Sequence, residues 1–531
     1  MSQARLTSGL ALLALALAAC GSTAASSTAS GAVASQANGG SGLGAAPGAG
    51  LPIDGSGLGG TTGGGPSASG STGGTGQAVS GSTGGTSSAG TTGSPAGATG
   101  GTSTGGAVAM GPGVTAKTIT IGFNYTKDGT AGNAAIGSNL GQGDELNEAK
   151  AVQEDINAHG GVAGRKLEII FHAYSNQSTD SGSVQDESAC QDYVQDHKVF
   201  AVAGAGISET LPGCLTKAGV LNAASGKIIS ADNAFYRRYP HYADLASLTQ
   251  DRMMRDLAAR LVAKRYFDGW NSATGAPATT PAKVGILTFD GRTEWETPLT
   301  RILLPALKAA GHPVADQDIF RAHYASTTTE AGPLAGDMQS AALRFRQDGV
   351  THVIFLDGSG LMNLFFSQNA ANQHYYPRYG VNSATGMQAL VDGGDIDAKQ
   401  LRGALGIGWL PGLDLPASAS GRYATAGGRH CASVLSKAGF TFTDTNSRTI
   451  AYGACDQLYF IAAAINGAGP SVTLQSAQAA IDRLGSSFVP ANIPASYFSA
   501  SQHDAVASVY DLAWDDGCGC AKYTDGGHHA G

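Results

Sequence analysis

The stretch Ala-Gly-Ile-Ser-Glu-Thr at residues 205–210 combines a flexible glycine with two hydroxyl side chains. It follows an apolar run at 199–205, which predicts a strand buried on both faces, and a helical pattern begins at Ser208. In open parallel sheets, ligands bind beyond the carboxyl ends of strands, where the free N–H groups of a helix N-terminus attract an anion. Gly206, Ser208 and Thr210 are therefore candidate ligand-binding residues. An alternative is that Ser208 serves only as the helix N-cap, a position that favours serine.

Polar residues also follow three other expected strands. These strands are predicted at 283–289, 351–356 and 378–381, and the polar residues after them are Asp290, then Asp357 and Ser359, and then Asn382 and Ser383. A carboxylate would bind the ammonium group of an amino acid, so Asp290 and Asp357 are candidates for that role. Each of them could instead stabilise a loop or cap a helix.

The sequence after residue 116 lacks the motifs of several common enzyme classes. It contains no Gly-x-Ser-x-Gly, no His-Glu-x-x-His and no Gly-x4-Gly-Lys-Ser/Thr. Gly204 and Gly206 are spaced as in a dinucleotide-binding loop, but Glu209 stands where the third glycine would be. His528 and His529 lie in a polar tail, and the other histidines are scattered. We therefore expect a protein that is not an enzyme and needs no cofactor or metal ion.

Strands and helices alternate along residues 117–382. A strand at 117–126 leads into a glycine-rich loop, and a helix at 143–159 and a strand at 165–172 follow. Further helices are expected at 183–197, 208–218, 245–267, 297–310, 331–347 and 361–372. Such alternation requires parallel strands with helices on both faces, which predicts an α/β fold.

The C-terminal part departs from this alternation. Three helices are expected at 429–437, 447–466 and 474–484, followed by a hairpin at 505–523 around Asp515-Asp516-Gly517. Because no strands lie between these helices, they need another part of the chain to pack against.

Residues 20–116 differ in composition from the rest of the chain. Gly makes up 78 of the 531 residues and is concentrated here; Asp54 is the one charged residue between Arg5 and Lys117, and residues 21–116 contain no aromatic side chain. Such a segment cannot bury enough apolar surface to offset its backbone entropy, so we expect a disordered linker at 20–116. The net charge of −8, without a basic cluster in the folded part, argues against binding to nucleic acid.

The N-terminus has the pattern of an export signal. Arg5 precedes a largely apolar stretch at 6–19, which is too short to span a bilayer core of about 30 Å as a helix and ends in small residues that suit a signal peptidase. The sequence Leu-Ala-Ala-Cys ending at Cys20 resembles the bacterial lipobox, in which the cysteine is acylated. We expect a lipoprotein signal peptide at 1–19 and a lipid on Cys20 at the outer face of the plasma membrane. The alternative is an ordinary secretory signal with an incidental cysteine.

The remaining cysteines favour disulfides. The chain has seven cysteines, so six remain after Cys20 is set aside, and an even number in an exported chain is typical of disulfide pairing. Sequence order suggests the pairs Cys190 with Cys214, Cys431 with Cys455, and Cys518 with Cys520, although pairing cannot be deduced from sequence. A metal or redox site at Cys518-Gly-Cys520 is the alternative for the last pair.

The segment 157–167, Asn-Ala-His-Gly-Gly-Val-Ala-Gly-Arg-Lys-Leu, resembles the helix-to-strand turn of the branched-chain amino-acid-binding family. Its members are type I periplasmic binding proteins of ABC importers. With the lipobox, the opening strand, the two α/β series and the terminal hairpin, the resemblance covers about 117–524, and we treat 525–531 as a tail.

This resemblance implies two doubly wound α/β lobes, joined by three crossovers at a hinge, that close on a ligand in the cleft between them. The first lobe would comprise about 117–240 and 405–500, and the second about 245–404 and 505–524. In this family, hydroxyls and amides of the loop after the third strand hold the ligand carboxylate, which makes Ser208 and Thr210 the first choices here. Tyr125 follows the first strand, where the family often presents a ligand-facing side chain.

The function that the resemblance implies is capture of a small polar solute, such as an amino acid, an amide or a related carboxylate, for delivery to an ABC permease in the plasma membrane. We expect a monomer. The alternative is a sensor that signals to a membrane partner without transport. The second lobe lacks a clearly placed Tyr and Glu of the kind that amino-acid binders often offer, so the solute is not named by the sequence.

Overall fold

The computed structural model describes residues 110–226 and 230–531. The expected signal peptide at 1–19, the expected acylation site Cys20 and most of the expected linker, up to residue 109, lie outside these ranges. The prediction of a linker as far as residue 116 was too long, because the Gly111 N–H donates to the carbonyl of Val472 at 2.7 Å and Val114 is buried. All described residues fall in the compact unit Gly100–Gly531. None of the helices in the described ranges has both the length and the apolar character needed to cross a membrane.

The first sheet has five parallel strands in the order β2-β1-β3-β4-β5. The strands are β1 (Thr118–Thr126), β2 (Lys166–Tyr174), β3 (Ala201–Ala203), β4 (Leu221–Ala224) and β5 (Tyr242–Asp244). The helices that follow them are α1 (Gly129–Ala135), α2 (Glu145–Ala158), α3 (Gly182–Cys190), α4 (Thr210–Ala218) and α5 (Asn233–Arg238). β3 and β4 are buried along their whole length, as strands covered by helices on both faces should be.

The second sheet has a parallel part in the order β12-β11-β10-β8-β9 and an antiparallel edge formed by β13 and β14. Its strands are β8 (Val284–Phe289), β9 (Ile319–Ala322), β10 (His352–Phe355), β11 (Arg378–Asn382), β12 (Leu405–Gly408), β13 (Ser508–Asp515) and β14 (Cys520–Tyr523), and β15 (His528–His529) pairs with β13. Its helices are α6 (Gln250–Ala263), α7 (Thr293–Pro298), α8 (Leu304–Ala309), α9 (Ala331–Gln347), α10 (Leu361–Asn372) and α11 (Met387–Asp392).

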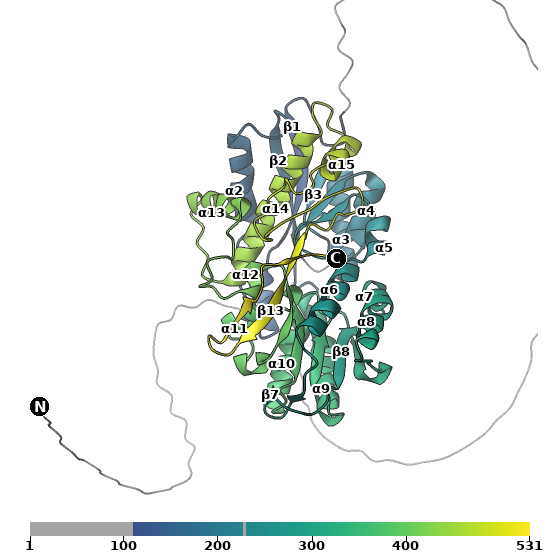
Figure 1. Cartoon of the computed structure of the whole chain (residues 1–531). Helices are drawn as coiled ribbons and strands as arrows, with labels where there is room; N and C mark the ends of the chain where they lie inside the picture. Colours follow the sequence, from purple (N-terminus) through teal and green to yellow (C-terminus); the bar gives the residue numbers. More distant parts are fainter. Residues whose placement is uncertain (1–109, 227–229) are drawn as a thin grey trace, which may run out of the picture. The chain divides into compact units, whose positions relative to one another are not determined.

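The late helices return to the first sheet. α13 (Ala426–Lys437) and α14 (Thr445–Gly467) pack against α2, α14 also contacts β3 and β4, and α15 (Leu474–Asp482) packs on α14. Figure 1 shows these helices around β1–β3 and the strands of the second sheet apart from them. The chain therefore passes between the two sheets three times: after β5, after β12 and before β13. We call each sheet with its helices a lobe, and the expected α/β class with parallel sheets is confirmed.

The turn between α2 and β2 explains the glycines of the 157–167 segment. Gly160 and Gly161 have φ angles of 99° and 73°. A Cβ on Gly161 would lie 2.0 Å from the carbonyl oxygen of Arg165, so no other residue fits there. Asn157 closes the turn, because its Oδ1 accepts the N–H of Leu167 at 2.8 Å and its Nδ2 donates to the carbonyl of the same residue at 3.0 Å.

Some local elements differ from the sequence prediction. The expected glycine-rich loop after β1 contains the short helix α1, in which Gly129 and Gly132 are buried. A Cβ on Gly129 would lie 2.4 Å from the Gln142 side chain, so these glycines allow close packing of a helix. The edge strand β9 and the small hairpin of β6 (Trp270–Asn271) and β7 (Ala276–Pro277) were not expected, because both lie in short, weakly patterned segments.

The six cysteines lie in the three pairs that sequence order suggests. The Sγ–Sγ distances are 1.81 Å for Cys190–Cys214, 2.02 Å for Cys431–Cys455 and 1.95 Å for Cys518–Cys520. The first pair links α3 to α4, and the second links α13 to α14. These two pairs are therefore placed to tie neighbouring helices of the first lobe together, whereas Cys518–Cys520 lies at the turn between β13 and β14.

Candidate ligand-binding site

A cavity of about 320 Å3 lies between the two lobes. The first lobe contributes the end of β1 and the loops after β3 and β4, and the second lobe contributes the loop after β10 and the start of α10. Helix α14 forms a further part of the wall with Thr449, Gly453 and Gln457, which are spaced by four residues and so share one face of the helix. The cavity thus lies at the carboxyl ends of strands from both sheets, where parallel sheets bind their ligands.

The cavity wall is mainly apolar and nearly free of charge. Among the described residues, its one charged side chain is that of Glu145, whose carboxylate accepts a hydrogen bond from the side-chain amide of Gln142. Large apolar side chains cover much of the remaining wall: Phe123, Ile136, Leu140, Ile207, Leu361, Leu364, Leu390, Trp409, Leu410, Leu413 and Ile450. Such a wall suits a ligand with a mainly apolar surface.

The candidate residues from the sequence divide into three groups. Three line the cavity: Tyr125, Gly206 and Ser359. Two line a smaller adjoining cavity of about 30 Å3: Asp357 and Asn382. Four line neither of these cavities: Ser208, Thr210, Asp290 and Ser383.

The loop after β3 is hydrogen bonded to a carboxylate of the protein itself. Asp186 on α3 is fully buried; its Oδ1 accepts the N–H of Ile207 at 2.9 Å, and its Oδ2 accepts both the N–H of Ser208 at 2.9 Å and the Ser208 hydroxyl at 2.7 Å. Burial raises the pKa of Asp186, and the hydrogen bonds from Ser208 and Ile207 oppose this rise. The Ser208 hydroxyl also accepts the N–H of Thr210, while Glu209 is the N-cap residue of α4.

The loop after β10 has the same arrangement. Asp357 is fully buried and accepts the N–H groups of Ser359 at 2.9 Å and Met362 at 3.0 Å, as well as the Ser359 hydroxyl at 3.3 Å. Burial raises the pKa of Asp357 against the effect of these bonds. The Asp357 carboxylate thus stabilises the start of α10, which is the alternative to ligand binding given for this residue in the sequence analysis. Asp290, the other candidate carboxylate, is exposed, and its own N–H donates to the carbonyl of Ala322.

Asn382 and Ser383 stabilise the end of β11. The Oδ1 of Asn382 accepts the N–H of Ala384 at 2.8 Å, and the hydroxyl of Ser383 donates to Asp414 at 2.7 Å. Asp414 also accepts the hydroxyl of Tyr523 and the N–H of Leu410. Burial raises the pKa of Asp414 to about 6 despite these bonds. This network joins β11, the crossover after β12, and β14.

No family model and no curated protein matches this chain. Solved structures match it at low sequence identity. A solute-binding protein of an ABC transporter from R. palustris, in complex with 4-hydroxybenzoate, has a TM-score of 0.53 and 15% identity and covers 77% of this chain and 96% of its own. A fatty acid ABC transporter substrate-binding protein from Thermomonospora curvata has a TM-score of 0.53 and 16% identity, covering 80% and 95%.

A possible leucine/isoleucine/valine-binding protein from Rhodopirellula baltica also matches, with a TM-score of 0.51, 12% identity and coverage of 77% of this chain and 97% of its own. The chain has the fold of type I periplasmic solute-binding proteins. The resemblance drawn from residues 157–167 is thereby confirmed for the fold. In a type I binding protein, a cavity between the two lobes lies where hinge closure would enclose a solute.

Several polar residues of this cavity were missed by the sequence analysis. Gln457 on α14 and Asn492 in the loop after α15 both line the wall, and Ser225 follows β4. The four-residue spacing of Thr449, Gly453 and Gln457 was a usable signal, since it places two polar side chains and a glycine on one face of the helix. Asn492 gave no such signal because it lies outside any regular element.

Hydrogen bonds join the two lobes of the type I fold across the cavity. Asp395, after α11 of the second lobe, accepts the Ser138 hydroxyl at 2.7 Å and the Asn139 N–H at 2.8 Å from the first lobe. The hydroxyl of Thr328 in the second lobe donates to the carbonyl of Asn176 in the first at 2.6 Å. These bonds link loops that border the cavity, so the two lobes are in direct contact beside it.

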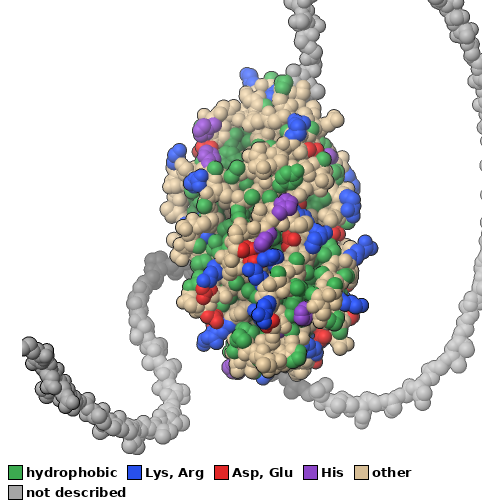
Figure 2. All heavy atoms as spheres, in the orientation of Figure 1, with side chains coloured by type: hydrophobic (Ala, Val, Ile, Leu, Met, Phe, Trp, Pro, Cys, Tyr) green, Lys and Arg blue, Asp and Glu red, His purple; other side chains and the backbone are tan. Residues whose placement is uncertain are grey.

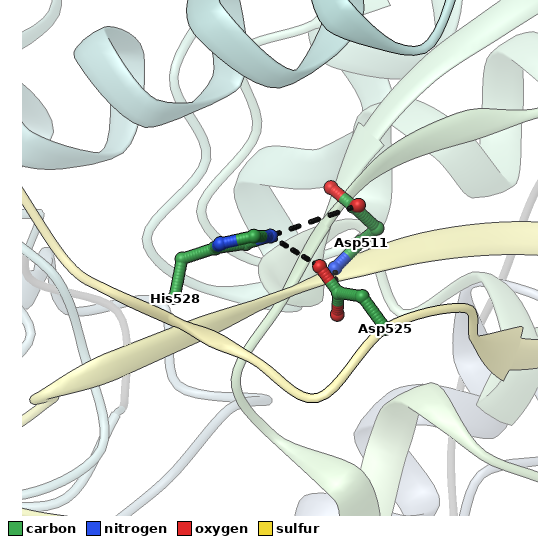
Figure 3. Close-up of side chains that lie close together, drawn as sticks. All are labelled: Asp511, Asp525 and His528. Atoms are coloured by element: carbon green, nitrogen blue, oxygen red, sulfur yellow. Dashed lines mark hydrogen bonds and ion pairs between the residues drawn. The ribbon is translucent and has the colours of Figure 1, made fainter.

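One further group of potential metal ligands occurs among the described residues: Asp511, Asp525 and His528, at the C-terminal edge of the binding-protein fold (Figure 3). Asp511 is already engaged by Arg260 at 2.5 Å and Lys264 at 2.8 Å, both from the α6 segment. Burial opposes ionisation, but the bonds from Arg260 and Lys264 outweigh it and hold the pKa of Asp511 below its ordinary value. Figure 2 shows basic, acidic and histidine side chains intermixed in the middle of this face. The group is an ion-pair network that fastens β13 to α6.

Proposed function

We propose that this chain is the extracytoplasmic solute-binding component of an ABC importer. It captures a small solute, of the amino acid, amide or carboxylate classes, by closing its two lobes, and it delivers the solute to a permease in the plasma membrane. The observation that carries the proposal is the cavity of about 320 Å3 between the lobes, which is walled by loops from both of them. Hydrogen bonds of Asp395 and Thr328 join these loops across the cavity. No reactive constellation was found in the described wall, and its apolar surface favours binding over catalysis.

The proposal includes export and anchoring. A lipid on Cys20 would hold the protein at the outer face of the membrane, and the three cysteine pairs would form disulfides in that oxidising compartment. Labelling with a radioactive or clickable fatty acid, in wild type and in Cys20→Ala, tests the anchor. Loss of label and release of the variant into the medium are expected, and equal labelling of the two proteins would contradict it.

Transport is tested by comparing solute uptake in cells with and without the gene for this chain. The solute is first identified by mass spectrometry, as the small molecule released when the purified full-length protein is denatured. Uptake of that solute should fall when the gene is deleted and return when it is restored. Unchanged uptake in the deletion strain would contradict an importer role.

A further inference from the structure

At two helix starts that border the cavity, buried carboxylates of the protein accept hydrogen bonds from the backbone N–H groups. Asp186 accepts from Ile207 and Ser208 before α4, and Asp357 accepts from Ser359 and Met362 at the start of α10. Both carboxylates are fully buried. A solute carboxylate at either loop would therefore meet amides that are already hydrogen bonded, with a fixed acidic group behind them.

The described wall offers no cation to compensate a solute anion. Within residues 110–226 and 230–531, no Lys, Arg or His lines the cavity, whereas the acidic Glu145 does. Burying a charge without a partner is strongly unfavourable. Lys227 follows the wall residue Gly226 in sequence and lies outside the described residues, so it is included in the test.

Another part of the wall has neutral hydrogen-bonding groups without partners. We call Ser225, Gln457 and Asn492 the amide patch. Within the described chain, the Oγ of Ser225 and the Oδ1 of Asn492 are buried without a partner, and no hydrogen bond is formed by the Gln457 side chain, which is 6% exposed.

The members of the amide patch lie around a glycine of α14. A Cβ on Gly453 would lie 3.1 Å from the Ser225 Oγ and 3.6 Å from the Asn492 Nδ2, and Gln457 follows one turn along the helix. The patch offers both donors and acceptors, and buried groups of this kind are normally satisfied by a partner. The Nδ2 of Asn492 already donates to the carbonyl of Thr449 at 2.9 Å. A solute group that both donates and accepts hydrogen bonds would satisfy the Asn492 Oδ1 together with the Gln457 and Ser225 side chains.

We infer that the solute is uncharged, with an apolar body and a primary amide or a similar neutral donor–acceptor group that binds the amide patch. The solute N–H donates to the Oδ1 of Asn492, and the solute carbonyl accepts from Gln457 or Ser225. Its apolar body packs on large apolar side chains of the wall, such as Leu361 and Trp409. This inference rests on the proposed solute-binding function and narrows its ligand to one class.

Matched pairs of solutes test the inference by isothermal titration of the purified full-length protein. The pairs are hexanamide with hexanoate, and 4-hydroxybenzamide with 4-hydroxybenzoate, which differ in the charge of one group. Because the carboxylate would be buried unpaired, the amide should bind at least about tenfold more tightly within each pair. Tighter binding of the carboxylate would overturn the inference and leave solute binding itself intact.

Variants then test where the amide binds. Gln457→Leu should weaken hexanamide binding by about tenfold, whereas Gln347→Leu, at an exposed position at the end of α9, should not change it. Equal hexanamide affinity in Gln457→Leu and wild type would overturn the assignment to the amide patch. Lys227→Met should leave the amide preference unchanged; a carboxylate preference in wild type that disappears in Lys227→Met would overturn the inference and identify the missing cation.

Failure of the proposed solute-binding function would give a different result from failure of the inferred ligand class. Mass spectrometry of the solute released from the denatured protein separates the two cases. A neutral amide-bearing molecule supports the inference, and an anionic solute overturns the ligand class alone. A protein that releases no solute and binds no member of either pair, in a strain whose uptake does not depend on it, would overturn the solute-binding function.

Discussion

The carboxylate of Asp456 accepts the backbone N–H of Asn492 at 3.1 Å and thereby fixes a residue of the cavity wall from behind. The same carboxylate accepts the N–H of Ala491 at 2.5 Å, and Asp456 is 2% exposed. Burial raises its pKa to about 7, while these two bonds oppose the rise. The cavity wall therefore depends on a buried group that titrates near neutral pH.

The pKa of Asp456 gives a pH dependence with a defined sign. The pKa in the unfolded chain is about 3.9, so between about pH 4 and 7 the folded state binds more protons than the unfolded state. The contribution of this group to stability is complete below about pH 4 and is lost as the pH rises through about 7. This contribution to the free energy of unfolding amounts to a few kcal/mol, on the order of 1.4 kcal/mol for each unit of pKa shift. Asp456→Asn should remove it and the pH dependence that it causes.

Urea unfolding of wild type and Asp456→Asn at several pH values between 4 and 8 measures this difference. Identical slopes of the unfolding free energy against pH for the two proteins would show that Asp456 does not titrate in this range.

Closure of the lobes should depend on Asp395. Asp395→Ala removes the acceptor for the Ser138 hydroxyl and the Asn139 N–H, so the open form should gain population and solute affinity should fall by roughly tenfold or more. The matched control is Asp397→Ala, because Asp397 is exposed and its carboxylate accepts only a local N–H, from Lys399. Isothermal titration with the released solute measures both variants. Equal affinity in Asp395→Ala and Asp397→Ala would argue against a role for Asp395 in closure.

Asp186 should be essential to the first lobe. Asp186→Ala leaves the N–H groups of Ile207, which is buried, and Ser208, which is partly buried, without their acceptor. It should lower the free energy of unfolding by about 3 kcal/mol or more. Its neighbour Glu187 is exposed on the same helix, and Glu187→Ala should change stability by less than about 0.5 kcal/mol. Urea denaturation curves provide the comparison, and a mild effect of Asp186→Ala would mean that these N–H groups find another acceptor.

The cysteine pairs should differ in their effect on stability. In the chain-entropy description, a cross-link stabilises more when it closes a longer loop, and the sequence separations are 24 for Cys431–Cys455 and 2 for Cys518–Cys520. Replacing Cys431 and Cys455 by Ala should lower the free energy of unfolding by about 3 kcal/mol, and replacing Cys518 and Cys520 by Ala should lower it by about half of that. Denaturation of the two double variants tests the order, after mass spectrometry has confirmed the bonds in wild type. A larger loss of stability in the Cys518/Cys520 double variant would contradict the predicted order.

The sequence predicted long elements better than the partners of polar groups. Helices α9 and α10 were expected at 331–347 and 361–372, where the structure places them, because their apolar periodicity lies between clear breaks. Ser208 was expected to meet a ligand, yet its hydroxyl donates to Asp186. Residue type and helix position show that a hydroxyl is available at the helix start, but only the packing of α3 against α4 brings the carboxylate to it.

The central claim is that the cavity between the lobes binds the solute, and a pair of substitutions tests it most directly. Leu361→Trp, at the start of α10, adds bulk to the cavity wall, whereas Leu343→Trp, on α9, adds the same bulk at an exposed site away from it. Titration of each full-length variant with the solute released from wild type should show lost binding for Leu361→Trp and wild-type affinity for Leu343→Trp. Full binding by a correctly folded Leu361→Trp would contradict the account.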